Sequence, residues 1–234
     1  ALAVKGTGQR GRMLEVLAQL RGVSMHPISP DDAGDDATYW QQSARLQTLF
    51  AILEEIACKR EKVLIFCESL AMQALLAAEV RRRFKLSHPV ARIHGGVTGD
   101  QRQAAVDAFQ GRGPGFDAMI LSPKAGGVGL TLTAANHVFH LSRWWNPAVE
   151  DQATDRAFRI GQTRAVTVYL PQAVHPSPAL AGTSFDLKLH ALMERKRTLS
   201  RGLFAPSEQD DDADVLFDAV VTEAAPEPSQ VAMP

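Results

Sequence analysis

A glycine-rich segment at residues 122–136 has the composition of a phosphate-binding turn. It reads SPKAGGVGLTLTAAN and directly follows the apolar run DAMIL. Gly126, Gly127 and Gly129 permit tight turns beyond the carboxyl end of a strand, where backbone N–H groups can face a phosphate and open α/β sheets bind their ligands. A glycine-rich turn without a ligand has the same composition, so the glycines alone leave both interpretations open.

The neighbouring segment contains two arginines that could stabilise the charge of a transferring phosphoryl group. It reads WWNPAVEDQATDRAFRIGQ, residues 144–162, and its Asn-Pro start and Gly stop predict a helix over 147–160. Gln152, Arg156 and Arg159 fall at i, i+4 and i+7, on one face of that helix. A guanidinium is always charged and forks onto phosphate oxygens. The alternative is an exposed helix whose charges are merely solvated.

Alternating strands and helices must position these two segments. Short apolar runs predict strands at residues 62–66, 90–94, 117–122, 137–142 and 166–171. Amphipathic stretches predict helices between them, near residues 69–84, 99–110 and 147–158. Further helices are expected over residues 12–21, 43–56 (with Ser43 as N-cap) and 184–202. This alternation predicts an α/β fold, in which helices flank both faces of a parallel sheet.

The composition is that of an ordinary globular protein, with 234 residues of which 45% are hydrophobic. No run approaches the roughly 18 apolar residues of a membrane span, and no leader pattern opens the chain. The first residue is Ala1, so we expect a fragment or a processed product. Cys58 and Cys67 lack metal-ligand spacing, which predicts reduced thiols and no metal site.

Charge is distributed unevenly along the chain. Residues 205–234 contain eight acidic residues and no Lys or Arg, whereas residues 1–204 carry a net charge of +7. A basic body is compatible with a polyanionic partner, and equally with a solvated basic surface. The acidic tail is expected to be largely disordered.

Three other patterns are weaker signals. GTGQRG at residues 6–11 fits a dinucleotide fingerprint, but a Pro-Asp loop follows where the second strand should be, so a flexible linker is favoured. His137 and His140 lie three apart on a predicted strand, and therefore point to opposite faces. RRRFK at residues 81–85 closes a predicted helix, where cations suit the helix dipole; a nucleic-acid patch is the alternative.

Together the two glycine- and arginine-bearing segments resemble the fifth and sixth helicase motifs of the Swi/Snf family, the double-stranded-DNA translocases of helicase superfamily two. The resemblance covers about residues 14–203 and includes LRGVSMHP (20–27), SARLQTLFAILEEI (43–56), KVLIFCES (62–69), IHGGVTGDQR (93–102), VTVYL (166–170) and, more weakly, SFDLKLHALMERKRTL (184–199). It implies a C-terminal RecA-like helicase domain at residues 43–204. An N-terminal helical segment and linker, 1–42, would precede this domain, and the acidic tail, 205–234, would follow it.

The resemblance also implies a nucleotide site shared between two lobes. In this family ATP lies in a cleft between RecA-like lobes, and the first lobe, which holds the P-loop and acidic box, binds most of the ATP and Mg²⁺. This chain contains neither element. Carried over by motif, Arg159 is the arginine finger, Arg156 a second phosphate contact and Gln152 an organiser of the cleft. Gly127 and Gly129 would lie near the nucleotide, and Arg159 is expected to lie away from the DNA-facing loops.

DNA-backbone contacts are implied at the other end of the lobes. The candidate residues are Ser122, Lys124, Thr131, Gly95, Gly96 and Arg102. Trp145 matches the tryptophan of the family's WNP segment and is expected to couple the DNA-facing and ATP-facing motifs. Contacts to phosphates carry no sequence information, so little sequence specificity is expected.

Several residues depart from the family pattern. Ser142 replaces the usual acidic residue before the WNP segment, Thr131 replaces an Asn, and His94 stands where the family often has Asp. An extra stretch, residues 171–182, follows the last strand. These departures, with no histone-reading module in the chain, favour a prokaryotic, cytoplasmic and nucleoid-associated member over a nucleosome remodeller.

The sequence therefore predicts the C-terminal motor lobe of an ATP-dependent double-stranded-DNA translocase. Its partners would be duplex DNA and the first lobe of the same protein, and the isolated lobe would be monomeric and inactive as an ATPase. The alternative is a stand-alone nucleic-acid-binding module without ATP-linked activity, which would bind DNA tightly without a partner.

Overall fold

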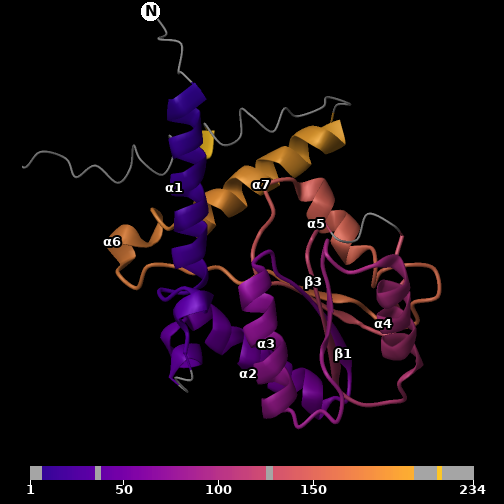
Figure 1. The fold of residues 1–234 in the computed structure, drawn as a ribbon. Coiled ribbons are helices and arrows are strands. Elements are labelled where there is room, and N and C mark those ends of the chain that lie inside the picture. The colour runs from indigo at the N-terminus through magenta and orange to yellow at the C-terminus, as the bar shows by residue number, and fades with distance from the viewer. Residues whose placement is uncertain (1–6, 35–37, 125–128, 203–214, 218–234) are drawn as a thin grey trace, which may run out of the picture. The chain divides into compact units, whose positions relative to one another are not determined.

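A parallel sheet of five strands forms the centre of the computed structural model, which describes residues 7–34, 38–124, 129–202 and 215–217 (Figure 1). The strands are β1 (Lys62–Phe66), β2 (Ala91–Ile93), β3 (Asp117–Leu121), β4 (His137–His140) and β5 (Thr167–Tyr169), in the order β2-β3-β1-β4-β5. Every pairing between neighbours is parallel. The predicted fold class, a parallel sheet flanked by helices, is confirmed.

The central strand β1 pairs with β3 on one side and β4 on the other. Its register places Lys62 opposite Asp117, and Val63 opposite Ala118 and His137. All residues of β1, β3 and β4 are buried, as expected for strands that are covered on both faces. β5 is an edge strand with two exposed residues.

One face of the sheet packs against α2 (Ala44–Cys58) and α3 (Leu70–Arg83). Side chains alternate between the two faces along a strand, so Val63 and Ile65 of β1 belong to this side's core. The same core includes Leu49 of α2, among other apolar side chains of the two helices.

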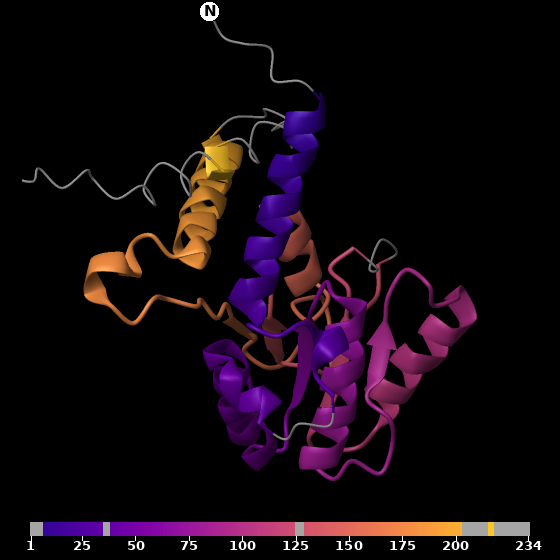
Figure 2. The same ribbon diagram turned by 60° about the vertical axis from the view of Figure 1, so that its left-hand side comes forward.

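The opposite face packs against α4 (Gly99–Gly111) and α5 (Pro147–Thr154). Leu64 and Phe66 of β1 point to this side, together with Phe109 of α4. Figures 1 and 2 show α4 on one side of the sheet and α2 with α3 on the other. The predicted covering of both faces is thus present.

Side-chain caps fix where the helices begin. The hydroxyl of Ser43 accepts a hydrogen bond from the N–H of Leu46 at the start of α2, as predicted. Asn146 caps α5 by accepting from the N–H of Ala148 at 2.9 Å, also as predicted. Thr98 forms a full capping box at the start of α4.

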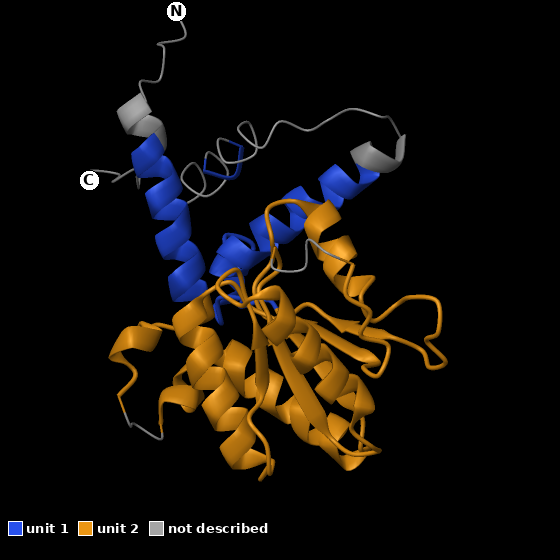
Figure 3. Ribbon diagram, turned by 45° about the vertical axis from the view of Figure 1, so that its right-hand side comes forward, with its two compact units in different colours: residues 1–24, 172–234 blue, residues 25–171 orange. Residues whose placement is uncertain are grey.

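The chain divides into two compact units, residues 25–171 and residues 1–24 with 172–234 (Figure 3). The first contains the whole sheet and the short helices η1 (Pro30–Asp32) and η2 (Tyr39–Gln42). The second contains α6 (Pro178–Ala181), α7 (Phe185–Gly202) and all but the last residue of α1 (Thr7–Met25). The boundaries proposed at residues 42 and 204 remain a prediction.

Within the second unit, Asp186 is a buried acceptor that joins three segments. Its carboxylate accepts from the Ser24 hydroxyl at 2.7 Å and from the Ala173 backbone N–H.

The linker interpretation of residues 6–11 is wrong from Thr7 onward, because α1 begins there. None of the described helices is long and apolar enough to cross a membrane.

Candidate nucleotide and nucleic-acid site

The segment with the two predicted cleft arginines leaves its helix early. α5 ends at Thr154, so Gln152 lies on the helix, whereas Arg156 and Arg159 lie in the turns that follow it. The prediction of one helical face shared by all three side chains is therefore wrong. The helical pattern stops where the Arg156 N–H bonds the Ala153 carbonyl at 3.4 Å and not that of Gln152, and the Arg156 carbonyl then accepts from the Leu132 N–H at 2.8 Å.

Arg159 reaches back across the glycine-rich loop that follows β3. Its Nη1 donates to the carbonyl oxygen of Gly129 at 2.8 Å and lies 3.3 Å from the carbonyl of Leu130 and from the hydroxyl of Thr131. A Cβ at Gly129 would stand 3.3 Å from this guanidinium, so glycine permits the close approach. The expected separation of Arg159 from the DNA-facing loops is wrong, because Thr131 was assigned to those loops.

Arg156 is buried beside two other positive charges. It is only 4% exposed. Burial lowers the pKa of its guanidinium, and the charges of Arg159 and Arg102 lower the pKa further. An arginine stays protonated in such a setting, so Arg156 keeps its positive charge. Arg102, predicted among the DNA contacts, thus acts electrostatically on the predicted nucleotide side.

Gln162, the last residue of the arginine-bearing segment, is a positioning residue to which the sequence analysis assigned no role. Its Nε2 donates to the carbonyl oxygens of Thr133 (3.0 Å), Ala135 (2.7 Å) and Ala157 (3.1 Å). Its Oε1 accepts from the N–H of Arg164 at 3.0 Å. The side chain therefore ties the turn after α5 to the loop after β3, which fixes the two motif segments to each other.

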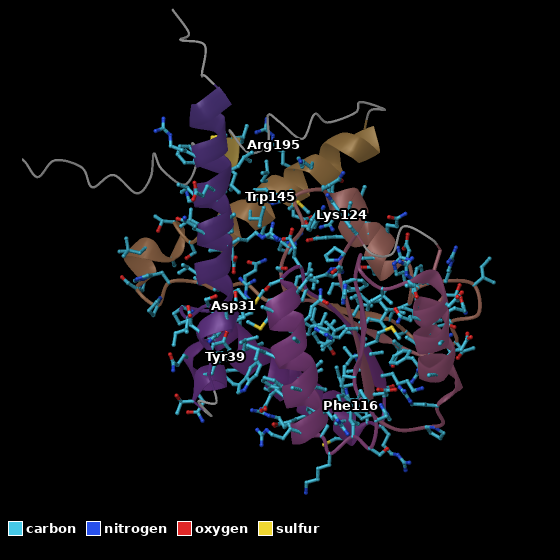
Figure 4. The ribbon with its side chains drawn as sticks, in the orientation of Figure 1. Asp31, Tyr39, Phe116, Lys124, Trp145 and Arg195 are labelled. Atoms are coloured by element: carbon cyan, nitrogen blue, oxygen red, sulfur yellow. The ribbon has the colours of Figure 1, made fainter. Side chains whose placement is uncertain are left out.

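Ser122 and Lys124, two of the predicted DNA contacts, lie just beyond the carboxyl end of β3. The Ser122 hydroxyl accepts from Nε2 of the buried Gln73 at 2.8 Å. Lys124 is exposed, and its ammonium lies 5.0 Å from the centroid of the Trp144 ring, within the range of a cation–π interaction. Figure 4 shows Lys124 and Trp145 at the end of the sheet opposite Phe116, which precedes β3.

The other predicted DNA contacts follow β2 at the same edge. The N–H of Gly96 donates to Nδ1 of His94 at 3.2 Å, and a Cβ at Gly96 would lie 3.3 Å from that ring. Gly95 faces open space. Arg102, in the first turns of α4, donates from Nη2 to the Val97 carbonyl at 3.3 Å. The candidates thus come from the loops after β2 and β3 and from the start of α4. Gly127 lies outside the described residues.

A buried ion pair holds the segment between β4 and α5, where Trp145 lies half-buried. Nε of Arg143 donates to Glu150 at 2.8 Å, and both side chains are only 2% exposed. The same carboxylate accepts from the N–H of Trp144 at 2.8 Å. Glu150 therefore anchors the backbone beside the tryptophan that was predicted to couple the DNA and ATP motifs.

The two histidines of β4 take part in separate contacts on opposite faces, as predicted. His137 Nε2 lies 2.6 Å from Glu61, whereas His140 stacks on Phe66 and lies 2.9 Å from the Thr154 hydroxyl. No three His, Cys, Asp or Glu side chains of the described residues form a group that could hold a metal ion.

The parallel sheet and the two hydrogen-bonded motif segments, residues 122–136 and 144–162, define a helicase-type RecA-like lobe. The chain belongs to the helicase conserved C-terminal domain family, whose sequence pattern matches residues 44–161. It is 33% identical over 198 residues to the putative ATP-dependent helicase/translocase YwqA of Bacillus subtilis (strain 168), covering 85% of this chain and 20% of that protein.

Two further similarities were found, and the second is to a protein of the predicted Swi/Snf family. The Zorya protein ZorD of Escherichia coli O139:H28 (strain E24377A / ETEC) is 37% identical over 224 residues, covering 92% of this chain and 19% of that protein. The solved SWI2/SNF2 ATPase core domain of Sulfolobus solfataricus matches with a TM-score of 0.67 and 28% identity, over 92% of this chain and 40% of that one. The chain spans about a fifth of the length of both sequence relatives.

Proposed function

We propose that this chain is the C-terminal motor lobe of an ATP-dependent double-stranded-DNA translocase, and that Arg159 is its arginine finger. The other lobe of the parent protein would hold ATP and Mg²⁺. Arg159 would stabilise the charge that develops on the transferring phosphoryl group, and Arg156 would make a second phosphate contact. Gln152, Gly127 and Gly129 would complete the nucleotide side.

The observation that carries this proposal is the contact of Arg159 with the glycine-rich segment, close to a second arginine. Arg159 donates to the Gly129 carbonyl at 2.8 Å, and the charges of Arg159 and Arg102 act on the buried Arg156. Guanidinium groups fork onto phosphate oxygens, so a phosphate of ATP presented from the other lobe would suit this position.

Duplex DNA is the proposed second partner, bound through its backbone. Ser122, Lys124, Thr131, Gly95 and Gly96 come from loops at one edge, and exposed Lys124 offers a point charge to a phosphate. Arg159 also lies 3.3 Å from the Thr131 hydroxyl. Occupancy of the DNA-facing loop can therefore reach the arginine through one hydrogen bond. Trp145, in the segment anchored by Glu150, would extend this coupling.

The test is Arg159→Ala in the complete parent protein. We expect DNA-stimulated turnover to fall by about 10³–10⁵-fold, the effect of an arginine finger in other NTPases. Duplex affinity without nucleotide should fall far less than turnover, because Lys124 and the other proposed backbone contacts remain in place. Arg159→Lys should not restore turnover, because an ammonium lacks the guanidinium fork. The matched control is Arg82→Ala on α3, whose side chain is 72% exposed and pairs with Glu79 at 2.7 Å.

Three outcomes would contradict the proposal. Near-normal turnover of the Arg159→Ala protein, together with a lower melting temperature, would make the arginine purely structural. A loss of duplex affinity without a loss of turnover would assign Arg159 to the DNA interface and not to the nucleotide site. A complete parent without DNA-stimulated turnover would favour the alternative, a nucleic-acid-binding module without ATP-linked activity.

The bacterial relatives support a further proposal, that the parent acts in a prokaryotic cytoplasm, at the nucleoid. We also propose that the isolated lobe is a monomer.

A further inference from the structure

Gln73, in the first turn of α3, is a polar side chain in the apolar core between that helix and the sheet. It is fully buried, as are its apolar neighbours Met72 and Leu76. A buried amide costs free energy unless its polar atoms are hydrogen-bonded. The Oε1 atom of Gln73 has no hydrogen-bond partner in the part of the chain that the structure describes. Stability alone therefore does not account for a glutamine here, because an apolar side chain would avoid the unpaired oxygen.

The nitrogen end of this amide joins two strand ends. Nε2 of Gln73 donates to the Cys67 carbonyl oxygen at 2.7 Å and to the Ser122 hydroxyl at 2.8 Å. A carbonyl oxygen only accepts, so the contact with Cys67 fixes which end of the amide is the nitrogen. In the register of β1 and β3, Phe66 pairs with Leu121, and Cys67 and Ser122 are the residues that follow this pair. The side chain thus links the two segments just beyond the ends of the strands.

This arrangement leaves Ser122 as a hydrogen-bond donor. A hydroxyl has one proton and two lone pairs, and an amide N–H of Gln73 occupies one of those lone pairs. The backbone N–H of Ser122 is engaged as well, since it donates to the Ile93 carbonyl at 2.9 Å. The hydroxyl proton has no acceptor among the described residues, and the residue is partly exposed. The proton is therefore available to a ligand whose atoms only accept, as phosphate oxygens do.

We propose that Gln73 is a positioning residue, which holds the Ser122 hydroxyl as a donor to a phosphate of the DNA backbone. The inference rests on the proposed function, in which Ser122 contacts DNA. Serine hydroxyls commonly contact DNA phosphates, and this one would add to the point charge that Lys124 supplies two residues further along. The motif segments give no indication of Gln73, because it lies on α3, outside both of them.

The size of the expected effect follows from the freedom that Gln73 removes. A serine side chain has three staggered χ1 rotamers, and the hydrogen bond selects one of them. Without that bond Ser122 would occupy all three, so the fraction that is ready to bind should fall by up to about threefold. Loss of the hydroxyl itself should cost roughly three- to tenfold in affinity, the effect of one hydrogen bond. A hydroxyl carries no charge, so the salt dependence of binding should not change.

The experiment measures the duplex affinity of the complete parent by fluorescence anisotropy over a range of salt concentrations, without nucleotide. Gln73→Met nearly keeps the size of the side chain but removes both donors, so affinity should fall about threefold, with an unchanged slope of log K against log salt concentration. Gln73→Asn is one methylene shorter, cannot reach both acceptors, and should show the same loss. The matched control is Gln47→Met, at an exposed position of α2, which should change nothing.

A double variant tests whether Gln73 acts through Ser122. Ser122→Ala should lower duplex affinity by roughly three- to tenfold, and adding Gln73→Met should lower it no further. An additive loss would overturn the inference, because Gln73 would then act by another route. A smaller salt slope in the Gln73→Met protein, like that expected for Lys124→Ala, would also overturn it, because the change would then have displaced the loop that carries Lys124.

Two further results separate this inference from the proposed function. Unchanged affinity in the Gln73 variants, while Lys124→Ala weakens binding, would overturn the positioning role alone. So would a raised KM for ATP at unchanged duplex affinity, which would assign the Ser122 hydroxyl to a phosphate of the nucleotide. A parent that binds no duplex would overturn the proposed function and the positioning role with it.

Discussion

Replacing Gln162 should loosen the junction between the glycine-rich loop and the arginine turn. Its Nε2 lies 2.7 to 3.1 Å from three carbonyl oxygens, two of them in the loop after β3, so one of its two N–H groups is shared. Two hydrogen bonds at about 0.5–1.5 kcal/mol net each make the expected cost of Gln162→Ala about 1–3 kcal/mol. For a chain of this size that corresponds to roughly 2–12 °C in melting temperature.

Urea unfolding followed by circular dichroism measures this loss. Gln162→Met keeps the size of the side chain but removes the donors, so it should lose nearly as much stability as the alanine variant. Gln152→Ala on α5 is the matched control; Gln152 is exposed, so we expect a change of no more than about 0.5 kcal/mol. A methionine variant as stable as the parent sequence would refute the reasoning, because packing alone would then hold the turn.

Two further predictions follow from the loop after β3 and from the start of β1. Lys124→Ala should weaken binding to all duplex sequences equally, and it should reduce the slope of log K against log salt concentration by up to about 1, as measured by fluorescence anisotropy. Lys59→Ala is the control, and a Lys124→Ala slope equal to that of the control would show that Lys124 does not contact the DNA. The hydrogen bond with His137 holds the pKa of Glu61 below its ordinary value. The ionised Glu61 carboxylate therefore stabilises the folded state at every pH above the pKa that Glu61 has in the unfolded chain. Glu61→Gln should therefore lower stability at pH 7 in urea titrations, by a difference that shrinks as the pH falls below about 4; a pH-independent difference would contradict this.

Local sequence pattern was sufficient for most of the sheet. The run KVLIF predicted β1 at residues 62–66 with the bounds that the structure gives, because every residue of the strand is buried. β4 is shorter than the predicted 137–142: Leu141 leaves the strand but still donates its N–H to the Phe66 carbonyl at 2.9 Å. Strand ends depend on neighbouring strands, which a periodicity argument does not include.

The candidate site was located by motif, but its geometry was not predictable from spacing. Helical spacing placed Arg156 and Arg159 on one face, whereas the Leu132 N–H takes the Arg156 carbonyl and the helix stops first. The tertiary hydrogen bonds of Gln162 carry no local signal, since a glutamine after Ile-Gly has no distinctive pattern. The only indication in the sequence was that Gln162 ends the arginine-bearing segment, residues 144–162.

The order of the strands has a consequence for synthesis of the chain. β1 is first in sequence but central in the sheet, and its register pairs Lys62 with Asp117 and Val63 with His137. At about 5–20 residues per second, a ribosome makes its first partner, β3, several seconds after β1 itself. During that interval the apolar run KVLIF has no ladder to join, and unpaired strands of this kind are where aggregation starts. The nascent chain therefore depends on α2 and α3, which are made before β3, to shield one face of that strand.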